Sequence, residues 1–80
     1  MNDPLIVFPN PANRSITISI QTDGNIEIYN QIGELILSKQ YNYSSNENLD
    51  ISNLNEGIYL IKFQNENGSI QTQKLIIRKD

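Results

Sequence analysis

Apolar side chains recur at every second position along much of this chain. In the clearest stretch, Ile16, Ile18 and Ile20 alternate with small polar residues. A half-buried β-strand has this period, because successive side chains point to opposite faces of its sheet. No segment shows a competing helical period. The alternation therefore predicts strands that pack one face on a core and expose the other.

Short strands of this kind are predicted along the whole chain. Turn residues separate them at intervals of about 8 to 12 residues, which is typical of an all-β sandwich. Such short connections favour antiparallel pairing, because parallel strands need longer crossovers. The sequence therefore predicts an immunoglobulin-like antiparallel β-sandwich of about seven short strands, at residues 5–8, 15–20, 26–29, 34–39, 49–51, 58–64 and 69–78.

Two local features are expected within this pattern. Asp23-Gly24 lies between two alternating stretches and predicts a hairpin, because glycine tolerates the positive φ of a tight turn. In the last strand the apolar parity shifts between Ile70 and the run 75–77. That shift predicts either a β-bulge or burial on both faces of the strand.

The spacing Leu54-x-x-Gly57-x-Tyr59 matches the tyrosine corner of immunoglobulin-like sandwiches. In that motif a tyrosine near the start of the sixth strand returns its hydroxyl to the backbone a few residues upstream. The alternative is an ordinary half-buried strand tyrosine that follows a turn glycine. The position between the predicted fifth and sixth strands favours the corner.

Composition limits how a chain of 80 residues is stabilised and which partners it suits. It has fourteen Ile and seven Leu but no Cys, so disulfides are excluded and packing must hold the fold. The net charge of −3 and the scattered basic residues argue against a nucleic-acid partner. No apolar run approaches the roughly 18 residues of a membrane span.

Catalysis and cofactor binding have little support in this sequence. The chain lacks His and Cys, so the commonest general base and the strongest neutral-pH nucleophile are missing. Asn48, Asp50 and Ser52 alternate along one strand face and superficially suggest calcium, but they offer one carboxylate where calcium sites usually have several. We expect no catalytic residues, no cofactor site and no metal site.

The tyrosines leave one binding alternative open, a sugar-stacking platform. Aromatic residues in a strand-rich sequence are more often core or cross-strand partners. Tyr59 is also assigned to the corner. The four tyrosines in question are Tyr29, Tyr41, Tyr43 and Tyr59.

Pro9-Asn10-Pro11 is the least ordinary segment of the chain. The prolines fix their own φ and push the preceding residues, Phe8 and Asn10, towards extended geometry. We expect a stiff, non-pairing break that ends the first strand at a sheet edge.

Taken together, these features resemble the carboxy-terminal sorting domain of the type IX (Por) secretion system of Bacteroidetes, type A. Residues 7–12, Val-Phe-Pro-Asn-Pro-Ala, are similar to its opening signature, and residues 26–34 to its middle segment, which ends in a turn glycine. Residues 49–61 resemble its Gly-x-Tyr block, and residues 74–79 its closing strand. The signature positions that match are Pro9, Asn10, Pro11, Gly33, Gly57, Tyr59, Lys74, Arg78 and Lys79.

The resemblance implies a function and an organisation. Residues 5–80 are expected to form the sorting domain, and residues 1–4 a linker remnant or an artificial start. Such a domain follows a cargo domain, directs it across the outer membrane through the type IX machinery, and is then removed by a sortase-like peptidase. The expected location is the periplasm in transit, then the cell surface or the extracellular space.

Two further hypotheses accompany this interpretation. We expect the last strand, residues 70–79, to be the recognised element, with Lys74 and Lys79 making charge contacts, because strand edges pair readily with partner strands. The alternatives to a sorting signal are a carbohydrate-binding or adhesive module of an extracellular enzyme, and a spacer of the fibronectin type.

Overall fold

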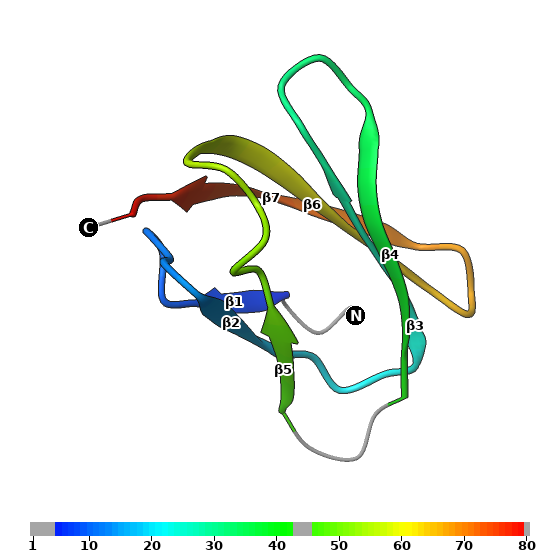
Figure 1. Ribbon diagram of the computed structural model, residues 1–80. Helices are drawn as coiled ribbons and strands as arrows, with labels where there is room; N and C mark the ends of the chain where they lie inside the picture. Colours follow the sequence, from blue (N-terminus) through cyan, green and yellow to red (C-terminus); the bar gives the residue numbers. More distant parts are fainter. Residues whose placement is uncertain (1–4, 43–45, 80) are drawn as a thin grey trace.

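The computed structural model describes residues 5–42 and 46–79. Over those residues its regular elements are all strands (Figure 1): β1 (Ile6–Phe8), β2 (Ser15–Ser19), β3 (Gly24–Tyr29), β4 (Leu35–Tyr41), β5 (Glu47–Asp50), β6 (Gly57–Asn65) and β7 (Ile70–Ile77). Within the described ranges, no helix is long and apolar enough to cross a membrane. Residues 1–4, the expected linker, and Tyr43 lie outside the described residues.

The strands form two sheets that pack face to face. One sheet has the order β1-β2-β5 and the other β4-β3-β6-β7. Every pair of neighbouring strands is antiparallel. The expected immunoglobulin-like β-sandwich is therefore confirmed.

The period-two pattern fills the space between the sheets. Ile16 and Ile18 enter it from β2, and Ile26 and Ile28 enter it from β3, and all four are fully buried. Each such side chain contributes about 1.5–3 kcal/mol on transfer from water. The full core consists of Val7, Ala12, Ile16, Ile18, Ile20, Ile26, Ile28, Tyr41, Leu49, Ile51, Ile61, Phe63, Leu75 and Ile77.

Tyr41 is the one polar side chain at the centre of this core over the described residues. Its ring meets that of Phe63 edge to face, with centroids 5.9 Å apart. Its hydroxyl donates a hydrogen bond to the carbonyl oxygen of Ile20 at 3.0 Å. A buried hydroxyl needs such a partner, because desolvation without one is costly. Tyr41 thereby ties β4 to the end of the opposite sheet.

The prediction of a hairpin at Asp23-Gly24 is wrong. β2 and β3 lie in different sheets, so this segment crosses from one layer to the other. Gly24 does not have a positive φ. A Cβ added there would lie 2.6 Å from Cζ of Phe63 and would collide with the carbonyl oxygen of Gln64. Glycine is needed because the backbone of β6 packs directly against this position.

Of the two alternatives expected for β7, burial on both faces is confirmed and a β-bulge is not found. The register with β6 continues without a shift from Ile77 to Ile70. Leu75 and Ile77 enter the core, whereas Ile76 is half-buried on the opposite face, so burial on both faces accounts for the apolar run. The register shift of this sheet lies instead just before Tyr29, between β3 and β4.

Two hairpins of the larger sheet share one turn design. Asn30 Oδ1 accepts hydrogen bonds from the backbone N–H groups two and four residues later, at 3.1 and 2.9 Å. Asn65 Oδ1 does the same at 3.0 and 2.9 Å. Gly33 and Gly68 take φ values of 88° and 89°, which L side chains rarely adopt. Both Asn-x-x-Gly segments therefore encode their turns locally.

Candidate recognition surface

Asn10 binds the outer edge of β7. Its Nδ2 donates to the carbonyl oxygen of Lys74 at 2.9 Å, and its Oδ1 accepts from the N–H of Ile76 at 3.0 Å. A primary amide offers one donor and one acceptor in this geometry, as a backbone peptide group does. Asn10 therefore takes the place of a neighbouring strand along this part of the edge.

Ala12 continues the same contact with backbone groups. Its N–H donates to the carbonyl oxygen of Ile76, and its carbonyl oxygen accepts from the N–H of Arg78, both at 2.8 Å. These bonds form a parallel bridge between Ala12 and Ile77, whose side chains are both buried. We call Asn10 to Ala12, with their four hydrogen bonds to residues 74–78, the edge clasp.

The edge clasp revises the sequence-based view of the two prolines. β1 ends at Phe8, as expected, and Pro9 and Pro11 are exposed. The segment is not a non-pairing break, however, because Asn10 and Ala12 both hydrogen bond β7. The prolines lack N–H groups, so only the residues beside them donate to β7.

The tyrosine corner is confirmed. Tyr59 donates its hydroxyl proton to the carbonyl oxygen of Asn55 at 2.7 Å. The bond spans the turn that leads from β5 into β6, with Gly57 at the first position of β6. It fixes the path by which the chain enters the larger sheet.

The three basic signature residues differ in their surroundings. The backbone N–H of Lys79 donates to Oε1 of Glu56 at 2.9 Å, and its Nζ donates to the carbonyl oxygen of Ser52 at 3.1 Å. Lys79 thus holds the chain to the corner. Lys74 and Arg78 are exposed, and no hydrogen bond or ion pair to their charged groups occurs within the described part of the chain.

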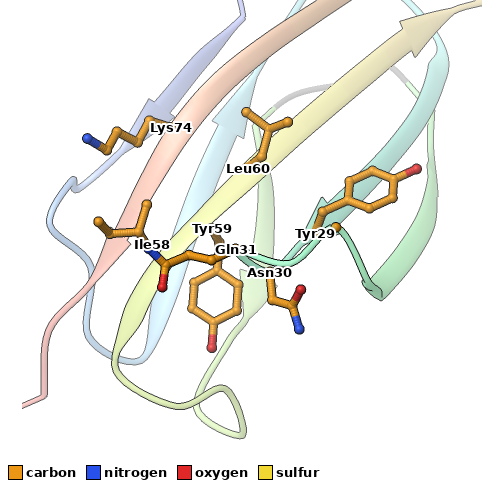
Figure 2. A pocket seen from close by; sticks show the side chains of 8 residues that line it. Tyr29, Asn30, Gln31, Ile58, Tyr59, Leu60 and Lys74 are labelled. Atoms are coloured by element: carbon orange, nitrogen blue, oxygen red, sulfur yellow. The ribbon is translucent and has the colours of Figure 1, made fainter.

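An open groove of about 560 Å³ lies on the outer face of the larger sheet. Figure 2 shows Ile58, Leu60 and Lys74 along one side of it and Tyr29 on the other. Ile58 and Leu60 are 39% and 43% exposed, so the floor of the groove is apolar and faces solvent. The lining residues are Tyr29, Asn30, Gln31, Gly33, Ile58, Tyr59, Leu60 and Lys74.

Signature residues from separate segments meet at this end of the sheet. Gly33, Tyr59 and Lys74 line the groove, and Gly57 lines a smaller hollow beside it. Asn10 binds the backbone of Lys74. These residues come together because the strands are antiparallel, so that the ends of β3 and β7 lie beside the starts of β4 and β6.

Charged and hydroxyl groups flank the groove on β3 and β6. Glu27 Oε1 lies 3.6 Å from Nζ of Lys62 and accepts a hydrogen bond from the Tyr29 hydroxyl at 2.8 Å. That hydrogen bond raises the pKa of Tyr29 above its ordinary value, with smaller effects from desolvation and from the negative charge of Glu27. At neutral pH the Tyr29 hydroxyl is therefore a protonated donor already engaged by Glu27.

Asp50 and Ser52 form a turn. Asp50 Oδ1 accepts from the backbone N–H of Ser52 at 2.9 Å, and this bond lowers the pKa of Asp50. The Ser52 side chain and the charge of Lys79 act in the same direction. Asn48 is engaged elsewhere, because its Oδ1 accepts from the Thr17 hydroxyl at 2.9 Å. Across residues 5–42 and 46–79, no three His, Cys, Asp or Glu side chains are grouped to hold a metal.

The tyrosines do not form a common platform over the described residues. Tyr41 is in the core, Tyr59 makes the corner, and Tyr29 alone has its ring across the groove from β6. Sequence reasoning missed the outward apolar residues Ile58 and Leu60. The signal was present, because Ile61 and Phe63 point inward and fix the alternation of β6.

A family model described as the secretion system C-terminal sorting domain matches residues 6–78. The chain belongs to this family. The match confirms the resemblance to this family inferred from the sequence, and with it the interpretation of the chain as a secretion signal, whereas the assignment to type A stays a prediction.

An endo-acting ulvan lyase of Formosa agariphila contains a similar segment. It is 32% identical to the sorting domain over 74 residues, which are 90% of this chain and 14% of that protein. The sorting domain therefore spans only a small part of the length of this relative.

Proposed function

We propose that this sorting domain directs an exported cargo protein across the outer membrane through the type IX secretion system and is then removed by a sortase-like peptidase. The observation that carries the proposal is the family match over residues 6–78. The convergence of the signature segments at one end of the β4-β3-β6-β7 sheet supports it, because a recognised surface must be contiguous.

The proposed activity is binding without chemistry of the domain's own. The edge clasp, the tyrosine corner and the hydrogen bonds of Lys79 hold three segments against β7 and β6 before any partner arrives. A surface that is already ordered loses little conformational entropy on binding. A rigid domain of this kind is therefore suited to be a signal that one machinery recognises on different cargo.

Lys74 and Arg78 are proposed as the charged contacts with the export machinery. Both are exposed, and Lys74 stands at the rim of the apolar groove. Rim charges chiefly steer encounter and select the partner. Lys79 is instead proposed to act by holding the corner, since its Nζ is bound to the carbonyl oxygen of Ser52.

We further propose that a cargo domain precedes residues 5–80 and that the whole protein passes through the periplasm to the cell surface or the extracellular space. The similarity to part of a much longer ulvan lyase supports a cargo of larger size. The cut that frees the cargo is proposed to fall near residues 1–4.

A reporter fusion in a Bacteroidetes host tests this function. Residues 1–80 are joined to the carboxy terminus of a fluorescent protein that carries a periplasmic signal peptide. Fluorescence is expected in the medium or at the surface, and in the periplasm when the domain is omitted or the host lacks type IX machinery. Equal export with and without the domain would refute the proposal.

The carbohydrate-binding alternative has one observation in its favour, the Tyr29 ring beside an open apolar groove. Titration of the isolated domain with ulvan, followed by tyrosine fluorescence, tests it. Saturable quenching that is lost in Leu60→Asp would favour this second function.

A further inference from the structure

Of the four outer strands that the structure describes, three are short or partly covered. β1 and β5 are only three and four residues long, and the edge clasp covers the end of β7. Short and covered edges are common protection against unwanted strand pairing. β4 differs, because it has seven residues and no proline, and among the described residues it pairs with β3 alone.

Hydrogen-bond alternation identifies the backbone groups of β4 that point away from β3, the one strand that β4 pairs with among the described residues. Ile76 uses its backbone N–H and carbonyl for the edge clasp, so it points away from β6. Antiparallel strands alternate between bonds to one neighbour and to the other. Following the registers across β6 and β3, Leu37 and Lys39 bond β3, and Ser38 and Gln40 point outward.

Apolar side chains continue from this edge onto the groove face. Leu35 and Ile36 are 51% and 40% exposed on β4. Leu35 lies opposite Tyr29 on β3, which lies opposite Leu60 on β6. In Figure 1 the tip of the β3–β4 hairpin stands clear of the rest of the molecule, and Ile32 at that tip is 80% exposed. Contiguous exposed apolar groups of this kind mark interaction sites.

From these observations we infer that the outer edge of β4 receives an extended strand of the export machinery by strand addition. The inference rests on the proposed function. Backbone groups of the added strand bond Ser38 and Gln40, and its side chains on the groove face extend the apolar row of Leu35, Tyr29 and Leu60. The added strand is uncharged along this stretch, because the one cation of β4, Lys39, is already paired with Glu47 at 2.8 Å.

A second copy of the domain is a poorer occupant of this edge. Pairing two seven-residue strands buries much less than the roughly 800 Å² per partner of a stable interface. The two chains would also carry the same net charge of −3. A larger partner adds contacts to the groove face, which strand pairing between two copies leaves open.

Proline variants test the two edges of the sheet against each other in the reporter fusion. Ser38→Pro removes an outward N–H without breaking the β3 ladder, because proline is tolerated where the N–H faces outward on an edge strand. Thr72→Pro is the matched change on β7, at an outward position that the edge clasp does not reach. Ser38→Pro is expected to lower export about tenfold, an effect of roughly 1.4 kcal/mol, and Thr72→Pro to leave it unchanged.

A second pair of variants distinguishes a loss of recognition from a loss of folding. Ile36→Asp and Ile70→Asp each charge an exposed isoleucine, 40% and 53% exposed, on opposite edges of the sheet. Circular dichroism and the melting temperature of each purified domain establish folding. Among folded variants, export is expected to fall for Ile36→Asp and to persist for Ile70→Asp.

The outcomes separate the possible failures. Absence of export for the unaltered domain refutes the proposed function, and this inference with it. Normal export of folded Ser38→Pro and Ile36→Asp refutes strand addition at β4 alone. Loss of export in the β7 variants only would assign recognition to the last strand. A concentration-dependent dimer that Ser38→Pro abolishes would overturn the inference in favour of a second copy.

Discussion

Asn10 Oδ1 accepts a hydrogen bond from the backbone N–H of Ile76 at 3.0 Å, although the two residues are 66 positions apart. One side chain thereby joins the opening signature of the sorting domain to its closing strand. The contact explains why asparagine stands between the prolines, because a primary amide both donates and accepts.

Replacing Asn10 tests the edge clasp. Asn10→Ala is expected to cost about 1 kcal/mol, since the two lost hydrogen bonds are exposed and water partly replaces them. In a domain of this size that lowers the melting temperature by about 4–8 °C. Hydrogen exchange of the Ile76 amide should accelerate in Asn10→Ala. In the control variant Asn25→Ala, exchange of the same amide should stay unchanged. Unchanged exchange at Ile76 would contradict the role of Asn10.

Tyr59→Phe tests the tyrosine corner. The variant loses the 2.7 Å hydrogen bond to the carbonyl oxygen of Asn55. Its free energy of unfolding, measured by urea denaturation, is expected to fall by about 1 kcal/mol. Tyr41→Phe should cost more, about 1–3 kcal/mol, because it leaves the carbonyl of Ile20 buried without its hydroxyl donor. Equal losses for the two variants would contradict this difference in burial.

Substitutions at Gly24 and Gly33 test two different reasons for glycine, which are steric crowding at Gly24 and a positive φ at Gly33. Gly24→Ala is expected to cost about 1–3 kcal/mol, because its Cβ meets the backbone of β6. Gly33→Ala is expected to cost about 1–2 kcal/mol, because alanine disfavours a positive φ. Asparagine should be better tolerated than alanine at Gly33, where nothing lies within 4 Å of the added Cβ, and worse at Gly24. Urea midpoints measure all four variants.

The lowered pKa of Asp50 predicts that the domain loses stability in acid. The pKa of Asp50 is lowered in the fold, chiefly by the N–H of Ser52. Its contribution to stability is therefore present above the ordinary value of 3.8 and is lost as the pH falls through the lowered value. Asp50→Asn keeps an acceptor but removes the charge. Its unfolding free energy should fall less steeply with acid than that of the unaltered domain.

Tyr29 predicts the opposite effect in alkali. Its pKa is raised by the hydrogen bond to Glu27, so that bond stabilises the fold below the ordinary value of 10.0 and is lost as the pH rises through the raised value. Ultraviolet titration of Tyr29→Phe against the unaltered domain isolates this ionisation. Glu27→Gln should bring the pKa of Tyr29 closer to 10.0, and no change would contradict the assigned cause.

Local rules predicted the strands of this domain well. Alternation predicted the buried faces of β2 and β3, because these faces depend on neighbouring residues alone. The tyrosine corner was also predictable, since Tyr59 binds a carbonyl only four residues away.

Pairing across the sandwich was not predictable by the same rules. Asp23-Gly24 has the composition of a hairpin, but its conformation follows from the close approach of β6, 40 residues later. The edge clasp joins Asn10 to β7 over still larger separations of 64 and 66 positions, and a single sequence carries no sign of that contact. Local patterns specify which face of a strand is apolar, and the topology decides which strand lies beside it.

The parallel direction of Ala12 and Ile77 has a mechanical consequence. If a cargo is pulled from the amino-terminal side while the last strand is held, these two segments slide past one another along their length. Their hydrogen bonds then carry the load at the same time instead of opening one after another. This shear geometry makes the domain resistant to unfolding when its two ends are pulled apart.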